Sequence, residues 1–267
     1  MPINTPLMNI MTGVARKAGR AILRDFGELE NLQIMRKGLN DFVTKADLKS
    51  ERILKDELTR ARPHYCFVLE EGGVVEGPDK SHRWYIDPLD GTINFMHGVP
   101  HFAISIGLER EGHMVAGVVY NPISDDMYSA EKGQGSWHND RRLRVSARRD
   151  LADSLIATGI PHRGRPGQNE FIHEVDAVMR EVSGVRRFGS AALDLAWVAS
   201  GRYDAFWERA LSPWDIAAGI VLVREAGGLV SDLNSGQDLL TNGHILASNG
   251  QLHGPLLKLL KGAHSAT

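Results

Sequence analysis

The chain has 267 residues, of which 42% are hydrophobic and 24% are charged, and these proportions exclude a fibre or a disordered tail. Its 31 Lys and Arg residues nearly balance its 33 Asp and Glu residues, which gives a formal net charge of −2. This balance excludes a global basic field that would hold nucleic acid or an anionic membrane, so any anion must be bound locally.

We predict that residues 1–150 form an N-terminal α+β half. Apolar residues recur at helical spacing over 6–26, and Thr44 with Asp47 has the pattern of a capping box that opens a second helix over 44–60. Short apolar runs then predict strands, two of which pair as an antiparallel hairpin. The predicted strands are 65–69, 84–86, 101–108 and 114–120, with the hairpin turn at 109–113.

The remaining residues, 151–267, are predicted to form a C-terminal α/β half that completes the substrate site. Turn signals at Gly133, Gly135 and Asn139–Asp140 precede it. Strand and helix patterns then alternate without a repeat or a linker, so we expect the halves to share a rigid interface. The predicted strands are 154–158, 185–188, 203–207, 229–232 and 245–247, and the predicted helices are 170–182, 191–200, 213–226 and 254–260.

The cysteine content and the hydropathy of the chain indicate the cellular compartment in which the protein is expected. Cys66 is the only cysteine and lies in an apolar run, so no intrachain disulfide can form. No uncharged apolar stretch approaches the roughly 18 residues of a membrane span, and residues 1–10 lack a secretory pattern. We therefore expect a cytoplasmic protein without a membrane anchor.

Carboxylates are concentrated where predicted strands end and predicted helices begin. Glu70 follows one strand, Asp87 and Asp90 follow the next, and Asp215 opens a helix. Crowded carboxylates repel one another unless a cation lies between them, and hard divalent cations such as Mg²⁺ prefer oxygen ligands. The simplest interpretation is a magnesium site.

The run Asp87-Pro88-Leu89-Asp90-Gly91-Thr92 has the backbone chemistry for such a site. Pro88 fixes one torsion and Gly91 permits a sharp turn, so two carboxylates and the Leu89 carbonyl can point into one small volume. A short helix from Gly91 to Asn94 would offer free N–H groups to phosphate. An Asp-rich turn that satisfies its own hydrogen bonds is the alternative.

Two other motif classes fit this run poorly. An EF-hand is disfavoured because Pro88 and Leu89 break its alternation of oxygen ligands. A haloacid-dehalogenase-type phosphatase is disfavoured because Pro88 stands where its nucleophilic Asp would be. Neither calcium sensing nor phospho-aspartyl chemistry is expected.

Asp47 and Asp215 also fit purely structural roles. Thr44 and Asp47 have the spacing of a capping box, and Ser212-Pro213-Trp214-Asp215 has a cap, a first-turn Pro and a third-position acid. The capping and functional roles coexist if Thr44 caps the helix while Asp47 points to water. The residues alone leave both alternatives open.

Other motifs favour ordinary structure. His97 and His101 lack the intervening acid of a zinc protease motif, and Gly133-Gln134-Gly135 lacks the rest of a dinucleotide fingerprint, so neither a zinc nor a nicotinamide site is expected. One dense basic run is predicted to lie on a solvated hairpin edge, and an RNA or acidic protein partner is its alternative. The run consists of Arg141, Arg142, Arg144, Arg148 and Arg149.

Four ordered motifs resemble those of the inositol monophosphatase family over nearly the whole chain. They are Asn40–Asp47, Glu70–Glu71 with Asp87–Thr92, Gly189–Asp194, and Pro213–Gly219. The resemblance implies an α+β fold, a layered α-β-α-β-α sandwich of the inositol monophosphatase and fructose-1,6-bisphosphatase type. It also implies a magnesium-dependent, lithium-sensitive phosphatase that acts as a homodimer on inositol 1-phosphate or a similar small polyol phosphate.

The resemblance further implies roles for individual residues. The implied ligands of two or three Mg²⁺ ions are Glu70, Asp87, the Leu89 carbonyl, Asp90, Thr92 and Asp215. The implied catalytic residues are Asp47 and Thr92, which activate the attacking water, together with Glu70. The implied substrate-binding residues are Asp90, Gly91, Thr92, Arg186, Gly189, Ser190, Ala191, Glu208 and Asp215. Ile93 and Gly72 depart from the usual family pattern without removing a ligand.

Two rival functions remain. One is a sugar or nucleotide bisphosphatase of the same superfamily, which Glu208 disfavours because an acid facing the substrate repels a second phosphate. The other is an accessory protein of transcription or RNA processing with secondary phosphatase activity, for which Arg141 and Arg142 offer a contact.

Overall fold

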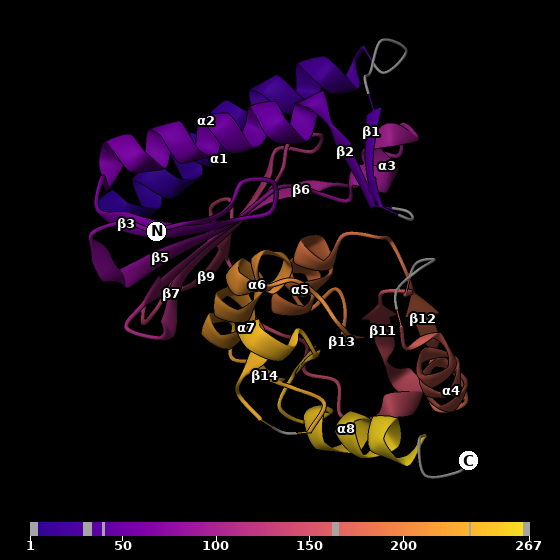
Figure 1. Ribbon diagram of the computed structural model, residues 1–267. Helices are drawn as coiled ribbons and strands as arrows, with labels where there is room; N and C mark the ends of the chain where they lie inside the picture. Colours follow the sequence, from indigo (N-terminus) through magenta and orange to yellow (C-terminus); the bar gives the residue numbers. More distant parts are fainter. Residues whose placement is uncertain (1–4, 29–33, 39–40, 162–165, 235, 264–267) are drawn as a thin grey trace.

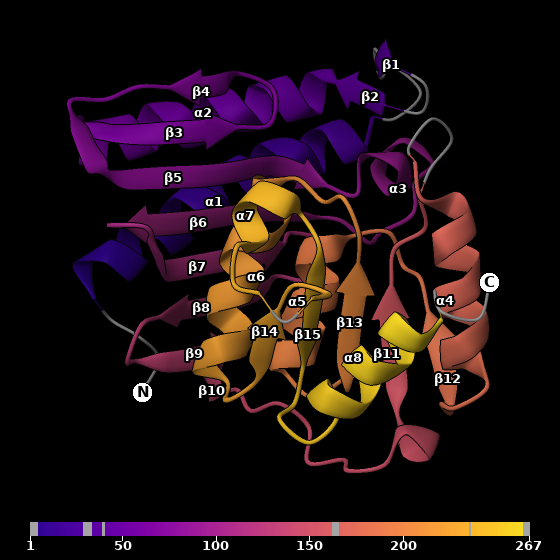
Figure 2. The same ribbon diagram turned by 60° about the horizontal axis from the view of Figure 1, so that its bottom comes forward.

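The structure is a computed structural model, and it describes residues 5–28, 34–38, 41–161, 166–234 and 236–263. The chain folds into five layers in the order helices, sheet, helices, sheet, helices, as Figures 1 and 2 show from two directions. The predicted α+β sandwich with alternating layers is therefore confirmed. Among the helices that the structure describes, none combines the length and apolarity that a membrane crossing requires.

The first two layers come from the N-terminal part of the chain. Helices α1 (Pro6–Phe26) and α2 (Lys45–Ala61) cover one face of an eight-stranded sheet of order β10-β9-β8-β7-β6-β5-β3-β4. β3 pairs in parallel with β5, and the other pairs are antiparallel. The strands are β3 (Tyr65–Leu69), β4 (Gly73–Val75), β5 (Asp79–Asp90), β6 (Ala103–Arg110), β7 (His113–Asn121), β8 (Asp126–Glu131), β9 (Gly135–His138) and β10 (Arg141–Arg142).

The middle helices α5 (Ala191–Ala199) and α6 (Pro213–Glu225) pack against both sheets. The second sheet has the order β12-β11-β13-β15-β14, and α4 (Gln168–Met179) and α8 (His253–Gly262) cover its outer face. Its strands are β11 (Leu155–Thr158), β12 (Gly184–Arg186), β13 (Ala205–Glu208), β14 (Leu229–Ser231) and β15 (Ile245–Ser248). The remaining elements are β1 (Ile34–Gly38), β2 (Asp41–Thr44), α3 (Thr92–Met96), the 3₁₀ helix η2 (Leu151–Asp153) and α7 (Leu239–Asn242).

One apolar core joins the two parts of the chain. Val119 and Tyr128 of the first sheet pack in the same cluster as Leu195 of α5, Ile216 of α6 and Phe206 of the second sheet. Burial of this shared apolar surface stabilises the two sheets in one arrangement. We propose the boundary between the halves near residue 150, in the segment between β10, which ends at Arg142, and β11, which begins at Leu155.

The long helices begin and end within about two or three residues of their predicted bounds, because hydrophobic periodicity and caps define them locally. The strands were predicted less completely. β5 begins at Asp79 instead of residue 84 because its first residues are polar and partly exposed, and β1, β2, β4, β8 and β9 have no predicted counterpart. β10 lies in the arginine run that is predicted to form a hairpin edge. The β6–β7 turn is also tighter than predicted. Arg110 pairs with His113, and Glu111 and Gly112 form the turn with φ of 52° and 77°.

Candidate active site

Two neighbouring parallel strands bring the first acids together. Leu69 of β3 pairs with Ile86 of β5, so Glu70 and Asp87 follow the paired residues side by side. The β5–β6 register shifts between Asp87 and Asp90, and this bulge allows both carboxylates to leave the strand near its end. The amide of Leu89 donates to Asp87 Oδ1 at 2.9 Å, which fixes the turn.

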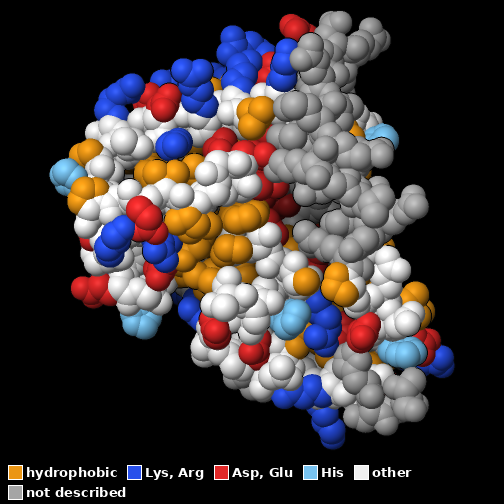
Figure 3. All heavy atoms as spheres, viewed as in Figure 1, with side chains coloured by type: hydrophobic (Ala, Val, Ile, Leu, Met, Phe, Trp, Pro, Cys, Tyr) orange, Lys and Arg blue, Asp and Glu red, His pale blue; other side chains and the backbone are white. Residues whose placement is uncertain are grey.

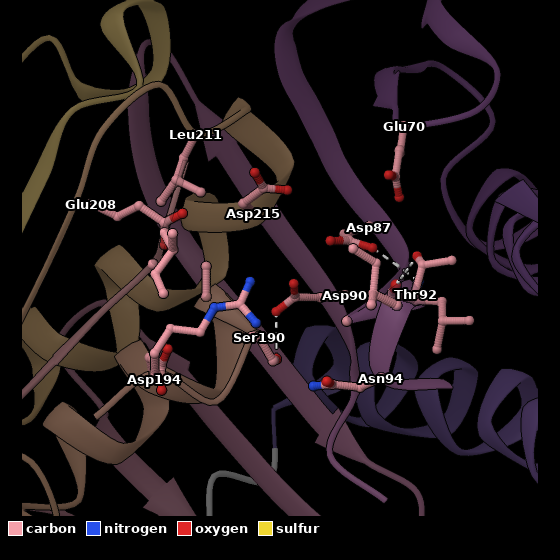
Figure 4. Close-up of a pocket in the computed structure, with 18 residues that line it drawn as sticks. Glu70, Asp87, Asp90, Thr92, Asn94, Ser190, Asp194, Glu208, Leu211 and Asp215 are labelled. Carbon is pink, nitrogen blue, oxygen red and sulfur yellow. Dashed lines mark hydrogen bonds between the residues drawn. The ribbon is translucent and has the colours of Figure 1, made fainter. Parts of the chain in front are cut away.

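The middle helices complete a cleft opposite these strand ends. Figure 3 shows acidic side chains gathering in a hollow near the middle of the molecule. In Figure 4, Asp215 and Glu208 lie across this cleft from Glu70, with Asp87 and Asp90 between them. The lining residues are Glu70, Asp87, Leu89, Asp90, Gly91, Thr92, Ile93, Asn94, Gly159, Ile160, Arg187, Gly189, Ser190, Ala191, Asp194, Glu208, Leu211 and Asp215.

Burial and mutual repulsion disfavour the charged form of these acids. Asp87 is only 2% exposed, and burial, followed by the charges of Glu70, Asp90 and Asp215, raises its pKa well above the usual range. Burial and then Asp215 and Asp47 likewise raise the pKa of Glu70. The cluster therefore carries a large electrostatic cost without a counter-charge.

The donor set fits a hard divalent cation. It consists of carboxylate and carbonyl oxygens, and Glu70 Oε2 is buried without a hydrogen-bond partner among the residues described. In the part of the chain that the structure describes, no three His, Cys, Asp or Glu side chains already form a ligand group.

Asp47 caps α2 and also contacts a residue that lines the cleft. It is fully buried, and its Oδ2 accepts from the Thr44 amide at 2.8 Å as part of a complete capping box. Its Oδ1 accepts from the Thr92 hydroxyl at 3.2 Å, and Thr92 lines the cleft. Burial raises the pKa of Asp47 to about 6, against the lowering effect of the Thr44 hydrogen bonds. The capping carboxylate thus reaches the cleft through Thr92 without lining it.

Asp90 links the two halves of the chain. Its Oδ2 accepts from Ser190 Oγ at 2.6 Å and from the Ala192 amide at 2.7 Å, at the beginning of α5. Burial raises the pKa of Asp90 to about 6, and these hydrogen bonds, with Arg187, oppose the shift. Asp215 is similarly braced, because its Oδ2 accepts from the Ser212 amide at 2.8 Å in the predicted capping box.

The structure separates the predicted substrate residues into two groups. Those that line the cleft are Asp90, Gly91, Thr92, Gly189, Ser190, Ala191, Glu208 and Asp215. Arg186 is exposed, is not among the lining residues, and donates to the Val185 carbonyl at 3.0 Å. Its neighbour Arg187 lines the cleft instead. The reason is that Arg186 still belongs to β12, whereas Arg187 follows the strand and turns toward Gly189.

Two further cleft residues, Arg187 and Asp194, have no role implied by the sequence motifs. Asp194 is 2% exposed, and its Oδ1 has no hydrogen-bond partner among the described residues. Burial, then Glu208 and Asp90, raise the pKa of Asp194 well above its usual range. Its helical spacing of four from Ser190 was a usable signal, since that spacing places both residues on one face of α5. Arg187 gave no such signal.

The structure places the histidine, glycine and arginine motifs as follows. His101 packs near Phe188 and Trp197 in an aromatic cluster. The turn between β8 and β9 contains Gly133, and the exposed strand β10 contains Arg141 and Arg142 at the edge of the sheet. No strand includes the rest of the arginine run, in which Arg148 lies 3.3 Å from buried Asp204.

Known proteins share both the sequence and the fold. A sequence profile of the inositol monophosphatase family matches residues 3–265. An inositol-1-monophosphatase of Mesorhizobium japonicum is 56% identical over 97% of this chain and 98% of its own, and a Nus factor SuhB of Pseudomonas aeruginosa is 42% identical over 96% of each. The crystal structure of extragenic suppressor protein suhB from Bartonella henselae superposes with a TM-score of 0.94 at 52% identity, covering 96% of this chain and 99% of that one.

Proposed function

The chain belongs to the inositol monophosphatase family, and we propose that it hydrolyses inositol 1-phosphate, or a similar small polyol phosphate, to the free polyol and inorganic phosphate. The observation that carries this proposal is the convergence of Glu70, Asp87, Asp90 and Asp215 on one cleft. Family members are metal-dependent phosphoric monoester hydrolases, and the acids of this cleft supply the donors that such chemistry needs.

We propose two or three Mg²⁺ ions as the metals. The residues that would hold them are Glu70, Asp87, the Leu89 carbonyl, Asp90, Thr92 and Asp215. Bound magnesium lowers the pKa of water and stabilises charge on the leaving oxygen during in-line displacement. The Thr92 hydroxyl and Asp47 carboxylate, 3.2 Å apart, would orient the attacking water and accept its proton. Ser190 and the Ala192 amide hold Asp90 in place for this task.

Glu208 would select the substrate by charge. Glu208 lines the cleft on the side opposite Glu70. Among the described lining residues, Arg187 is the one basic side chain that could balance a second phosphate. Glu208→Gln is expected to raise KM for inositol 1-phosphate about tenfold by weakening a charged hydrogen bond to a hydroxyl, and to lower KM for fructose bisphosphate. Steady-state kinetics on both substrates, with a nucleotide 3′,5′-bisphosphate as a third, provide the measurement.

The panel also decides between the two phosphatase hypotheses. Faster wild-type turnover of a bisphosphate than of inositol 1-phosphate at equal metal concentration would contradict the substrate proposed here. Glu111→Gln, at the exposed β6–β7 turn, is the control for a change of one surface charge and is expected to leave all three rates unchanged.

A second candidate function is participation in a transcription complex, which the relatives named Nus factor SuhB favour. We propose Arg141 and Arg142 as the contact, because the exposed edge strand β10 presents both side chains. The double variant Arg141→Glu/Arg142→Glu is expected to abolish capture of transcription-complex components in a pull-down while leaving phosphatase kinetics unchanged. Arg52→Glu/Arg180→Glu, two exposed helix positions, is the matched control, and capture that survives the β10 variant excludes this contact.

We also propose that the protein acts as a lithium-sensitive homodimer in the cytoplasm. Family resemblance supports the dimer and the lithium sensitivity, and Cys66, which is buried and not in a disulfide, suits a reducing compartment.

A further inference from the structure

The loop between β13 and α6 sets the spacing of two cleft carboxylates. Glu208 is the last residue of β13, and Asp215 lies in the first turn of α6. Leu211, between them, also lines the cleft, and Figure 4 shows all three side chains on the same side of it. Glu208 is held by its pairing with Ile245 of β15, so a shift of this loop at the beginning of α6 would move Asp215 relative to Glu208.

Ala210 in this loop has an unfavourable backbone conformation. Its φ is 56°, in the left-handed region that disfavours a residue with a Cβ atom. Such a conformation persists only where surrounding contacts hold it, and it occurs most often at functional sites. The contacts of Ala210 therefore indicate what fixes the loop.

The turn from α7 into β15 supplies these contacts. The Ala210 amide donates to His244 Nδ1 at 3.1 Å, and the Leu211 amide donates to the Gly243 carbonyl at 2.9 Å. The two segments approach so closely that a Cβ atom on Gly243 would lie 2.0 Å from the Leu211 carbonyl oxygen. Gly243 itself has a φ of 66°, so both steric space and conformation require glycine there.

The turn is itself anchored to the second sheet. The His244 amide donates to Asn242 Oδ1 at 2.8 Å, and Asn242 Nδ2 donates to Asp232 Oδ2 at 3.2 Å. Asp232, just after β14, also accepts from the Asn234 amide at 2.7 Å. His244 thus connects the rigid edge of the sheet to the strained residue of the loop.

We propose that His244 is a positioning residue: its hydrogen bond to the Ala210 amide holds the β13–α6 loop so that Glu208 and Asp215 face the same cleft. His244 does not itself line the cleft among the described residues. The proposal rests on the phosphatase function for its effect on turnover, but the hydrogen bond and the loop geometry can be measured without that function.

The first test is kinetic. His244→Ala removes the acceptor and is expected to lower kcat/KM roughly tenfold, because small displacements of positioned groups are costly in catalysis. His244→Asn retains an acceptor oxygen and is expected to recover most of the activity. Ala210→Gly in the His244→Ala background is also expected to restore it, since glycine adopts the left-handed conformation without the hydrogen bond. His113→Ala, an exposed histidine in the β6–β7 turn region, is the control.

The second test is amide exchange at Ala210, measured by NMR on the full chain. His244→Ala is expected to raise the exchange rate of the Ala210 amide about tenfold, because the amide loses one hydrogen bond. The amides of β13 are expected to stay protected. Three results would each overturn the proposal. The first is an unchanged exchange rate of the Ala210 amide in His244→Ala, and the second is wild-type kinetics of that variant. The third is a loss of activity in His244→Ala that neither His244→Asn nor the added Ala210→Gly change restores. The two proposals can also fail separately. If the wild-type protein shows no phosphatase activity but its Ala210 amide is protected from exchange, the proposed function is refuted and the positioning of the loop by His244 is not.

Discussion

Asp90→Asn is expected to lower kcat by at least about a hundredfold at saturating Mg²⁺, because metal-supported charge stabilisation contributes several kcal/mol to the transition state. Asp90 is the acid that both strand β5 and helix α5 hold in place, since it ends the strand and accepts from Ser190 and the Ala192 amide. An amide keeps the size of the side chain but removes the charge that a cation requires. Steady-state kinetics across a magnesium titration measure the effect.

The same variant must be shown to fold. The side-chain amide that Asp90→Asn introduces retains one acceptor oxygen for Ser190 or Ala192, and removal of one of several mutually repelling acids relieves electrostatic strain in the metal-free protein. The metal-free melting temperature is therefore expected to stay the same or rise. Asp140→Asn, in the exposed turn before β10, is the matched control and is expected to keep wild-type kinetics. Retained turnover of Asp90→Asn at saturating Mg²⁺ would contradict the role given to this cluster.

The metal-ligand candidates could be read from the sequence because each lies next to a strong local signal. Glu70 directly follows the apolar run that forms β3, and Asp87 directly follows the apolar run 84–86 within β5. Asp215 lies in a capping pattern. Such signals depend on a few neighbouring residues, so the structures that they predict are also found in the folded protein. The pairing of Leu69 with Ile86 then brings Glu70 and Asp87 together, a step that only the parallel topology supplies.

The positions of Arg187 and Ala210, which the sequence patterns do not single out, depend on long-range geometry. Whether Arg186 or Arg187 reaches the cleft is decided by the residue at which β12 ends, a boundary that sequence patterns place poorly. Ala210 carries no sequence sign of its positive φ, because the contact that holds it comes from His244, 34 residues away. Short strands such as β4 and β8 were missed because partner strands, and not their own composition, stabilise them.

The metal-free protein is expected to lose folding stability as the pH rises from about 4 to about 7, and divalent metal is expected to abolish most of this loss. Asp47 and Asp90 have pKa values raised to about 6, and those of Glu70 and Asp87 are raised well above their usual range. The folded state therefore retains protons that the unfolded chain releases near pH 4, so unfolding becomes easier as the pH increases. For Asp47 and Asp90, a shift of about two units corresponds to about 3 kcal/mol each.

Thermal unfolding between pH 4.5 and 8, with a chelator or with excess Mg²⁺, measures this linkage. A bound cation favours the ionised carboxylates and stabilises the folded state by mass action, so the melting temperature in Mg²⁺ should rise with pH relative to the chelated sample. Glu57 and Asp79, which are partly exposed and have lowered pKa values, act in the opposite direction but are screened by solvent. Asp87→Asn is expected to flatten the metal-free profile. A metal-free melting temperature that climbs steadily to pH 8 would mean that the buried acids do not repel one another, and the argument for a cation between them would fail.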